Sequence, residues 1–332
     1  AAISNYNFRM ISTENPVTAF ALDYSIVHAQ SKYNVNWILS ARHTLTGGLQ
    51  ASLYKLQPGD YKGVGSESII SRETQQTERG IENAAYLGDN FEVNSKLSVY
   101  TGLRYSWFAM VGPRTVNLYT PGQPIESIYQ TGTEEIQSGI VKTYSGLEPR
   151  LSARYLLPMN SSLKFSFGRT RQYLQMLSNN TAVAPSDIWK LSDTYIKPQV
   201  ADQISLGWFQ NRGGIIDLSV EGYYKMIHTA TEFQNGARLF RNQHIETEVL
   251  NARGKAYGIE LMAKKTTGRL NGWVSYTYAR SLMKTSSNFE LEKINNNSWY
   301  RSNFDKPHAF NLITNYKFNR RVNISFNTTW ST

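Results

Sequence analysis

Residues that could carry out acid–base or metal chemistry are scattered along this 332-residue chain. The histidines are His28, His43, His228, His244 and His308, and no two lie three to five residues apart, as HExxH-like zinc motifs require. No GxSxG sequence, which positions the serine of many hydrolases, occurs either. We therefore predict no catalytic, metal-binding or cofactor-binding residues and a protein that is not an enzyme. A barrel phospholipase with dispersed catalytic residues is the enzymatic alternative.

Aromatic residues in long connections are better candidates for a binding surface. Flat rings with few rotatable bonds give large contact areas at small entropic cost, as antibody binding sites illustrate. The candidates for ligand contact are Tyr173, Trp189, Tyr195, Trp299 and Tyr300. The alternative is that these rings pack the loops on one another or form an aromatic girdle. A separate expectation is a structural hydrogen bond between His308 and the nearby Asp305.

These candidates lie between predicted β-strands. Alternating hydrophobicity predicts about fourteen of them, with cores near 5–12, 17–29, 33–42, 45–56, 79–92, 95–109, 145–157, 161–170, 201–211, 214–228, 254–266, 269–282, 306–318 and 321–331. Tight turns rich in Gly and Asn alternate with long connections near 57–78, 110–144, 171–200, 229–253 and 283–305. Short turns at one end and long loops at the other are typical of outer-membrane barrels.

The strand pattern has one apolar and one polar face. In the last strand Val322, Ile324, Phe326 and Trp330 alternate with polar residues. The mean hydropathy is −0.44 although aromatic residues make up 13% of the chain, which fits a barrel whose alternate residues face lipid. No run of 18 uncharged apolar residues occurs, so no transmembrane helix is predicted. There is no cysteine, which excludes disulfides and thiolate metal sites.

The net charge of +10 first suggests nucleic-acid binding, but the basic residues are dispersed over different segments. No dense basic run and no nucleic-acid motif accompanies them. We expect these side chains in a wet lumen or at lipid headgroups, and no nucleic-acid partner.

Several phrases, in their order, resemble the barrel of TonB-dependent outer-membrane receptors of the Bacteroidota type. They begin with ENAAYLGD at 82–89 and GLRY at 102–105, followed by YSGLEPRLS at 144–152 and FSFGR at 165–169. GKAYGIEL at 254–261 and DKPH at 305–308 complete the series. The resemblance covers the chain from about residue 79 and, more loosely, the first 78.

This resemblance implies an all-β antiparallel transmembrane barrel in the cell outer membrane that imports a nutrient ligand. Such barrels have 22 strands and an N-terminal plug. Residues 1–332 would then be a partial barrel, the middle and later part, belonging to a longer polypeptide that carries the plug and terminal strands. The implied partners are a TonB-type energy-coupling protein, the lipid bilayer with its lipopolysaccharide and, as in glycan and peptide importers, a surface lipoprotein lid.

Three other readings compete with this one. A passive porin would fit a closed barrel of about fourteen strands, and a charged constriction loop in the lumen would support it, for which 110–144 is the expected segment. A receptor-like barrel could also serve as a structural subunit of an outer-membrane assembly, because fold does not fix function. A soluble β-sandwich is the last alternative.

Overall fold

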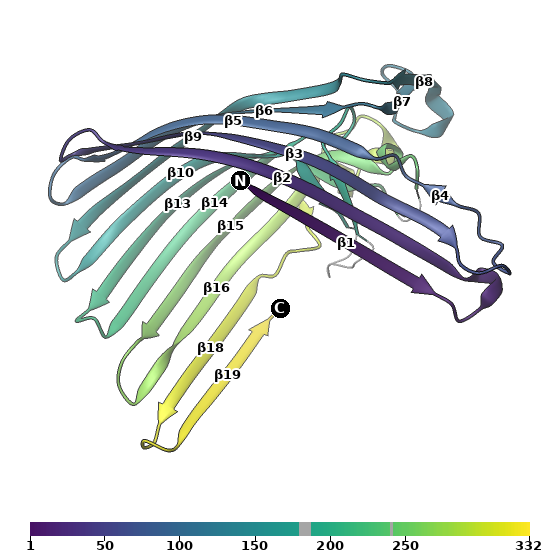
Figure 1. Cartoon of the computed structure of the whole chain (residues 1–332). Helices are drawn as coiled ribbons and strands as arrows, with labels where there is room; N and C mark the ends of the chain where they lie inside the picture. The colour runs from purple at the N-terminus through teal and green to yellow at the C-terminus, as the bar shows by residue number, and fades with distance from the viewer. Residues whose placement is uncertain (179–186, 240–241) are drawn as a thin grey trace.

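The computed structural model describes residues 1–178, 187–239 and 242–332. In this part of the chain one antiparallel sheet dominates, as predicted (Figure 1). Its long strands, in spatial order, are β1 (Ala2–Ser12), β2 (Phe20–Ile38), β3 (His43–Gly63), β5 (Glu78–Glu92), β6 (Leu97–Val111), β9 (Ile140–Leu157), β10 (Ser161–Gln172), β13 (Gln199–Arg212), β14 (Ile216–Phe233), β15 (Val249–Lys265), β16 (Leu270–Thr285), β18 (His308–Lys317) and β19 (Asn323–Ser331).

Smaller elements lie at the loop end of this sheet. Two short strands extend it, β4 (Glu73–Thr74) on β3 and β17 (Tyr300–Arg301) on β16. Two separate hairpins are β7 (Arg114–Tyr119) with β8 (Gln130–Ile136) and β11 (Leu174–Leu177) with β12 (Ile188–Leu191). Short 3-10 turns occupy Pro16–Thr18, Ser127–Tyr129, Ile245–Thr247, Glu290–Glu292 and Asn295–Asn297. No helix in the described residues is long and apolar enough to cross a membrane.

The predicted alternation of tight and long connections is confirmed. At the tight end, Gly213 and Gly214 between β13 and β14 have φ angles of 60° and 70°, which glycine adopts without steric cost. Between β18 and β19 the Asn319 side chain accepts hydrogen bonds from the backbone N–H groups of Arg321 and Val322. The tight turns therefore follow from local chemistry that is readable in the sequence.

One strand boundary was predicted wrongly. The segments 17–29 and 33–42 were expected to be two strands, but β2 continues without a break across 30–32 and ends at Ile38, so that its turn lies at 39–42, within the second predicted strand. Residues 30–32 contain no glycine, proline or asparagine, and their pairing continues in register, with Ser31 opposite Ala51 and Lys32 opposite Gln50. At 19 residues, β2 is nearly twice the roughly 9–11 residues that a tilted strand needs to cross a bilayer.

The outer face of the sheet is apolar and exposed. The large apolar side chains on this face include Leu49, Leu53, Leu87, Leu103, Leu147, Leu151, Ile204, Leu206, Ile259, Leu261, Ile324 and Phe326. They span the sheet from β3 to β19 and form a band far larger than soluble monomers expose to water. The band is the surface expected of a barrel against lipid.

The sheet is curved but open. Its order runs from β1 to β19, and Figure 1 shows these two strands as the edges of an arched wall. Buried residues gather on the inner face near the loop end, mainly on β3, β5 and β6 and on the β11–β12 hairpin. The candidate functional site therefore lies in this buried region, at the loop end of the inner face.

Candidate functional site

The β11–β12 hairpin folds back across the inner face of the wall. In sequence it connects β10 with β13, yet β12 lies against β3 and β5, on the far side of β9 and β6 in the sheet order. It therefore covers the loop end of the inner wall. A loop that folds inward was expected, if anywhere, at 110–144. The structure assigns this placement to 171–200 instead, of which residues 179–186 lie outside the described part.

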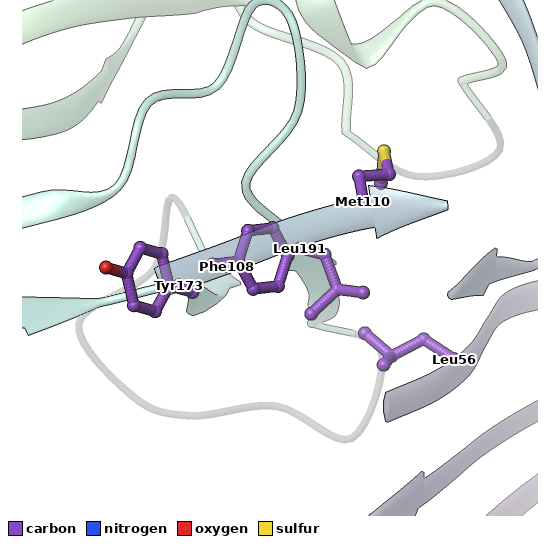
Figure 2. Packing of buried hydrophobic residues seen from close by; sticks show 5 residues of the cluster. All are labelled: Leu56, Phe108, Met110, Tyr173 and Leu191. Atoms are coloured by element: carbon purple, nitrogen blue, oxygen red, sulfur yellow. The ribbon is translucent and has the colours of Figure 1, made fainter. Parts of the chain in front are cut away.

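An apolar cluster fixes the hairpin to the wall (Figure 2). Leu56 of β3 and Phe108 and Met110 of β6 pack with Tyr173 and with Leu191 of β12, and all five are buried. The Phe108 and Tyr173 rings stack, with centroids 4.9 Å apart. Burial of these large apolar side chains, each contributing about 1.5–3 kcal/mol, stabilises the packing of the hairpin against the wall.

A glycine permits this close approach. Gly80 of β5 lies beneath the cluster, and a Cβ added there would be 2.8 Å from the Phe108 ring and 2.9 Å from Leu191 Cδ1. Such distances are shorter than any ordinary carbon contact. Because Phe108 and Leu191 are fully buried, neither side chain has free space into which it could move.

Four charged side chains form a buried quartet beside the cluster. Lys190 bonds Glu78 and lies 3.0 Å from Asp193 Oδ2. Arg114 bridges the same two acids at 3.3 and 3.5 Å. Glu78 Oε2 also accepts the Leu191 N–H at 2.8 Å. Two cations thus balance two carboxylates, which is the condition under which buried charge is tolerated.

The pKa values of the quartet follow from this pairing. Burial would raise the pKa of Asp193, but Lys190, Arg114 and the backbone N–H groups of Ile196 and Tyr195 outweigh it and lower that pKa. Burial would likewise lower the pKa of Lys190, and the attraction of Asp193 and Glu78 raises it instead. Both groups therefore stay charged at neutral pH.

A polar relay continues from the hairpin down the inner wall. The hydroxyl groups of Tyr173 and Ser106 lie 2.8 Å apart, and Ser106 donates to Glu148 at 2.6 Å. Arg104 then lies 3.7 Å from Glu148 and 3.5 Å from Glu82. Tyr173, Ser106, Glu148 and Arg104 are therefore linked in one continuous polar chain beneath the hairpin.

Other contacts tie the remaining loops together. The Tyr195 hydroxyl donates to the backbone carbonyl of Asn117 on β7, and the Tyr195 ring packs edge-on against Tyr119. Glu246 accepts hydrogen bonds from the Asn117 side chain at 2.6 Å and from the Tyr119 hydroxyl at 3.0 Å. Three long connections therefore meet at this point, over the loop end of the wall.

A second loop neighbourhood lies near β17. The Tyr300 hydroxyl donates to Glu232 at 2.7 Å, and burial followed by this hydrogen bond raises the pKa of Tyr300. The Lys255 ammonium lies 4.4 Å from the centroid of the Trp299 ring, a cation–π arrangement. Both aromatic rings are half-buried.

Comparison with known proteins gives one family. A model described as "TonB dependent receptor-like, beta-barrel" matches residues 2–332. The chain belongs to this family. Comparison with curated protein sequences gives no significant match.

Solved structures of TonB-dependent receptors share the fold. The copper transporter OprC superposes with a TM-score of 0.68 at 13% identity, over 99% of this chain and 49% of that one. The FrpB iron transporter from Neisseria meningitidis gives 0.59 at 12% identity, over 98% and 50% of the two chains. The ferric yersiniabactin uptake receptor FyuA from Yersinia pestis gives 0.60 at 13% identity, over 99% and 46%. The chain thus spans about half the length of these receptors.

The receptor fold brings only some of the predicted aromatic residues together. Tyr173 is 2% exposed and belongs to the apolar cluster, and Trp189 packs against the same cluster from β12. Tyr195 lies nearby in the same connection, whereas Trp299 and Tyr300 belong to the second neighbourhood. Packing of loops on one another, the alternative reading of these rings, describes Tyr173 best.

Sequence reasoning missed the buried quartet. Its members come from three places in the chain, and only Lys190 and Asp193 are close in sequence. One signal was available, because Lys190 interrupts the apolar stretch at 188–191. The expected pair of His308 with Asp305 was wrong. His308 Nδ1 bonds the Tyr276 hydroxyl at 2.8 Å, and Asp305 pairs with Arg280. Within 1–178, 187–239 and 242–332, no three acidic or histidine side chains converge as a metal site would require.

Proposed function

We propose that this chain forms part of the wall of an energy-coupled outer-membrane receptor, of the Bacteroidota type, that imports a nutrient without catalysis. The continuous apolar outer face opposite a polar inner face carries the proposal. Such a surface is costly in water and stable in a bilayer. The family match over residues 2–332 supports the receptor reading over other barrels.

The proposed ligand surface is the loop end of the wall. Trp189, Tyr195, Trp299 and Tyr300 would contact the ligand, and Tyr173 would support them from beneath. The solved relatives named above carry copper, iron and a ferric chelate, so metal-bearing solutes are the first ligands to test.

The proposed assembly includes parts beyond residues 1–332. A plug and further strands would complete and close the barrel, and a TonB-type protein would supply energy from the inner membrane. The outer face would contact lipid and lipopolysaccharide. A surface lipoprotein lid is a further proposed partner. The intact mass of the native polypeptide tests this architecture directly: we expect a mass well above 37.8 kDa, whereas a native mass near 37.8 kDa would contradict it.

Uptake of labelled ferric chelates and of copper by intact cells tests the function. We expect uptake to require both the receptor gene and the energy-coupling protein. Trp299→Ala should reduce it, whereas Trp330→Ala, on the exposed outer face, serves as the matched control and should leave it unchanged. Uptake that persists at full rate without the energy-coupling protein would contradict the proposal.

The passive porin is the second candidate, because one observation favours it. A charged segment does fold against the inner wall, as a constriction loop would. Its charges, however, pair with one another and are buried, so they do not line an open passage. Planar-bilayer recordings of the full-length protein separate the two. A receptor should remain closed, and steady ohmic conductance would favour the porin.

A further inference from the structure

We propose that the inner wall below the β11–β12 hairpin carries a binding site for the carboxylate or phosphate groups of an anionic solute. This inference rests on the proposed function and deepens it by naming the chemical class of the imported ligand. The site is a pocket of about 370 Å³, lined by Lys32, Tyr86, Arg104, Glu148, Arg150 and Arg171. Its volume lies at the lower end of the range for small-molecule sites, roughly 300–1,000 Å³.

Cations outnumber carboxylates in this pocket. Arg104 already serves both nearby acids, Glu82 and Glu148. Among the described residues no acidic side chain lies within ion-pair distance of Lys32, Arg150 or Arg171. Lys32 of β2 lines the pocket from beyond β3, β5 and β6, and Arg150 of β9 and Arg171 of β10 line it from two neighbouring strands, none of the three with an acidic partner in the described part of the chain. Their mutual repulsion would be relieved by an anion between them.

Arg171 is held over the pocket by a specific packing arrangement. Its guanidinium lies across Gly146 of β9, where an added Cβ would be 2.2 Å from the Arg171 Cζ. The Arg171 Nε is buried and has no hydrogen-bond partner. An arginine that is positioned by packing and keeps a free donor is suited to an oxygen anion, because its planar fork matches carboxylate and phosphate geometry.

The surroundings strengthen the attraction. The Tyr173–Ser106–Glu148 relay borders the pocket on the loop side, because Glu148 belongs to both. Lys32 lies 5.6 Å from the centroid of the Tyr86 ring, which holds the ammonium on the pocket side of β2. Further toward the tight turns, Arg154 and Lys164 face each other across β9 and β10 and extend the basic surface.

Isothermal titration of the full-length protein in detergent, with citrate and inorganic phosphate as probes, tests the site. We expect binding that weakens as salt rises, and about tenfold weaker binding in Arg150→Gln and in Arg171→Gln, since a charge-assisted hydrogen bond is lost in each. Gly146→Ala should weaken binding as well, because it displaces Arg171 without removing a charge. Lys225→Gln, on the inner face of β14, is the matched control and should bind like the wild type. Preference for one probe tells carboxylate from phosphate ligands.

Wild-type protein that binds neither probe would overturn the proposal. Equal weakening by Lys225→Gln would reduce the effect to general charge and would also overturn it. The titration and the uptake assay fail independently. Energy-dependent uptake without probe binding would contradict the anion site but agree with the proposed receptor function. Probe binding without energy-dependent uptake would contradict only the proposed receptor function.

Discussion

The inner wall differs between its first and second halves. In the first half, β3 and β6 contact the hairpin through the apolar cluster, β5 contributes Glu78 to the buried quartet, and the basic pocket lies between β2 and β10. Strands β13 to β19 present mainly hydroxyl and amide side chains, which bond one another across the strands, as Asn311 does to Ser275 at 3.3 Å and Ser325 to Asn315 at 2.7 Å. Outer faces and strand pairing are the same in both halves.

The difference teaches that strand formation and side-chain burial have separate causes in this fold. Alternating hydrophobicity makes a ribbon of either half, because its period is local. Which half becomes buried depends on where one long connection folds. The β11–β12 hairpin crosses to the inner face of the first half, whereas it contacts the second half at the loop ends of β14 and β15, near Phe233 and Val249. Substitutions should therefore affect stability very differently in the two halves.

The largest expected effect comes from breaking the quartet. Lys190→Met leaves Glu78 and Asp193 buried with only Arg114 as a counter-charge, and we expect a loss of about 3–5 kcal/mol in the free energy of unfolding. Denaturant titration of the purified protein measures it. Lys225→Met in the second half is the control and should change stability by no more than about 0.5 kcal/mol. Equal losses at the two positions would contradict the comparison.

Crowding the cluster should have the next largest effect. Gly80→Ala forces the Phe108 ring and Leu191 apart, which we expect to lower the free energy of unfolding by about 1–3 kcal/mol. Gly168→Ala is the matched control, since a Cβ there meets no atom within 4 Å. Thermal unfolding of both variants measures the difference in stability. A Gly80→Ala protein as stable as Gly168→Ala would show that the hairpin does not pack on β5.

A smaller loss should follow removal of one hydroxyl. Tyr173→Phe keeps the stack on Phe108 but ends the hydrogen-bond relay at Ser106, which still donates to Glu148. We expect about 1 kcal/mol of destabilisation in the same unfolding assay. Tyr223→Phe, on the inner face of β14, should be close to neutral. A larger loss at Tyr223 than at Tyr173 would reverse the assignment of the covered half.

The last effect is seen only in acid and concerns the titration of Asp193. Its pKa in the folded protein lies below the unfolded value, so its stabilising contribution is present above about pH 4 and is lost as the pH falls through the folded pKa. Unfolding measured from pH 7 downward should therefore show a loss of stability in the acid range that Asp193→Asn diminishes. Asp217→Asn, near the tight turns of the second half, should keep the wild-type slope. An unchanged slope in Asp193→Asn would contradict this role.

The sequence predicted the strands better than the site. Tight turns at Gly213 and Asn319 were readable because their chemistry is local. The length of β2 follows instead from its continuous pairing with β3, which lies beyond the reach of a local pattern. Tyr173 was expected to face a ligand because it follows a strand end. Its burial depends on Leu56, more than a hundred residues earlier, and no periodicity reports such a contact. The quartet escaped prediction for the same reason.

The inward fold of the β11–β12 hairpin is tested most directly by a disulfide between β5 and β12. Residues 1–332 contain no cysteine, so Gly80→Cys with Leu191→Cys introduces the only pair within them, at positions where an added Cβ on residue 80 lies 2.9 Å from Leu191 Cδ1. Cells that export the full-length protein to an oxidising compartment should form this bond, seen as a mobility shift on non-reducing gels. Gly168→Cys with Leu191→Cys should remain reduced. A shift in the control pair, or none in the first pair of a folded protein, would contradict the inward hairpin.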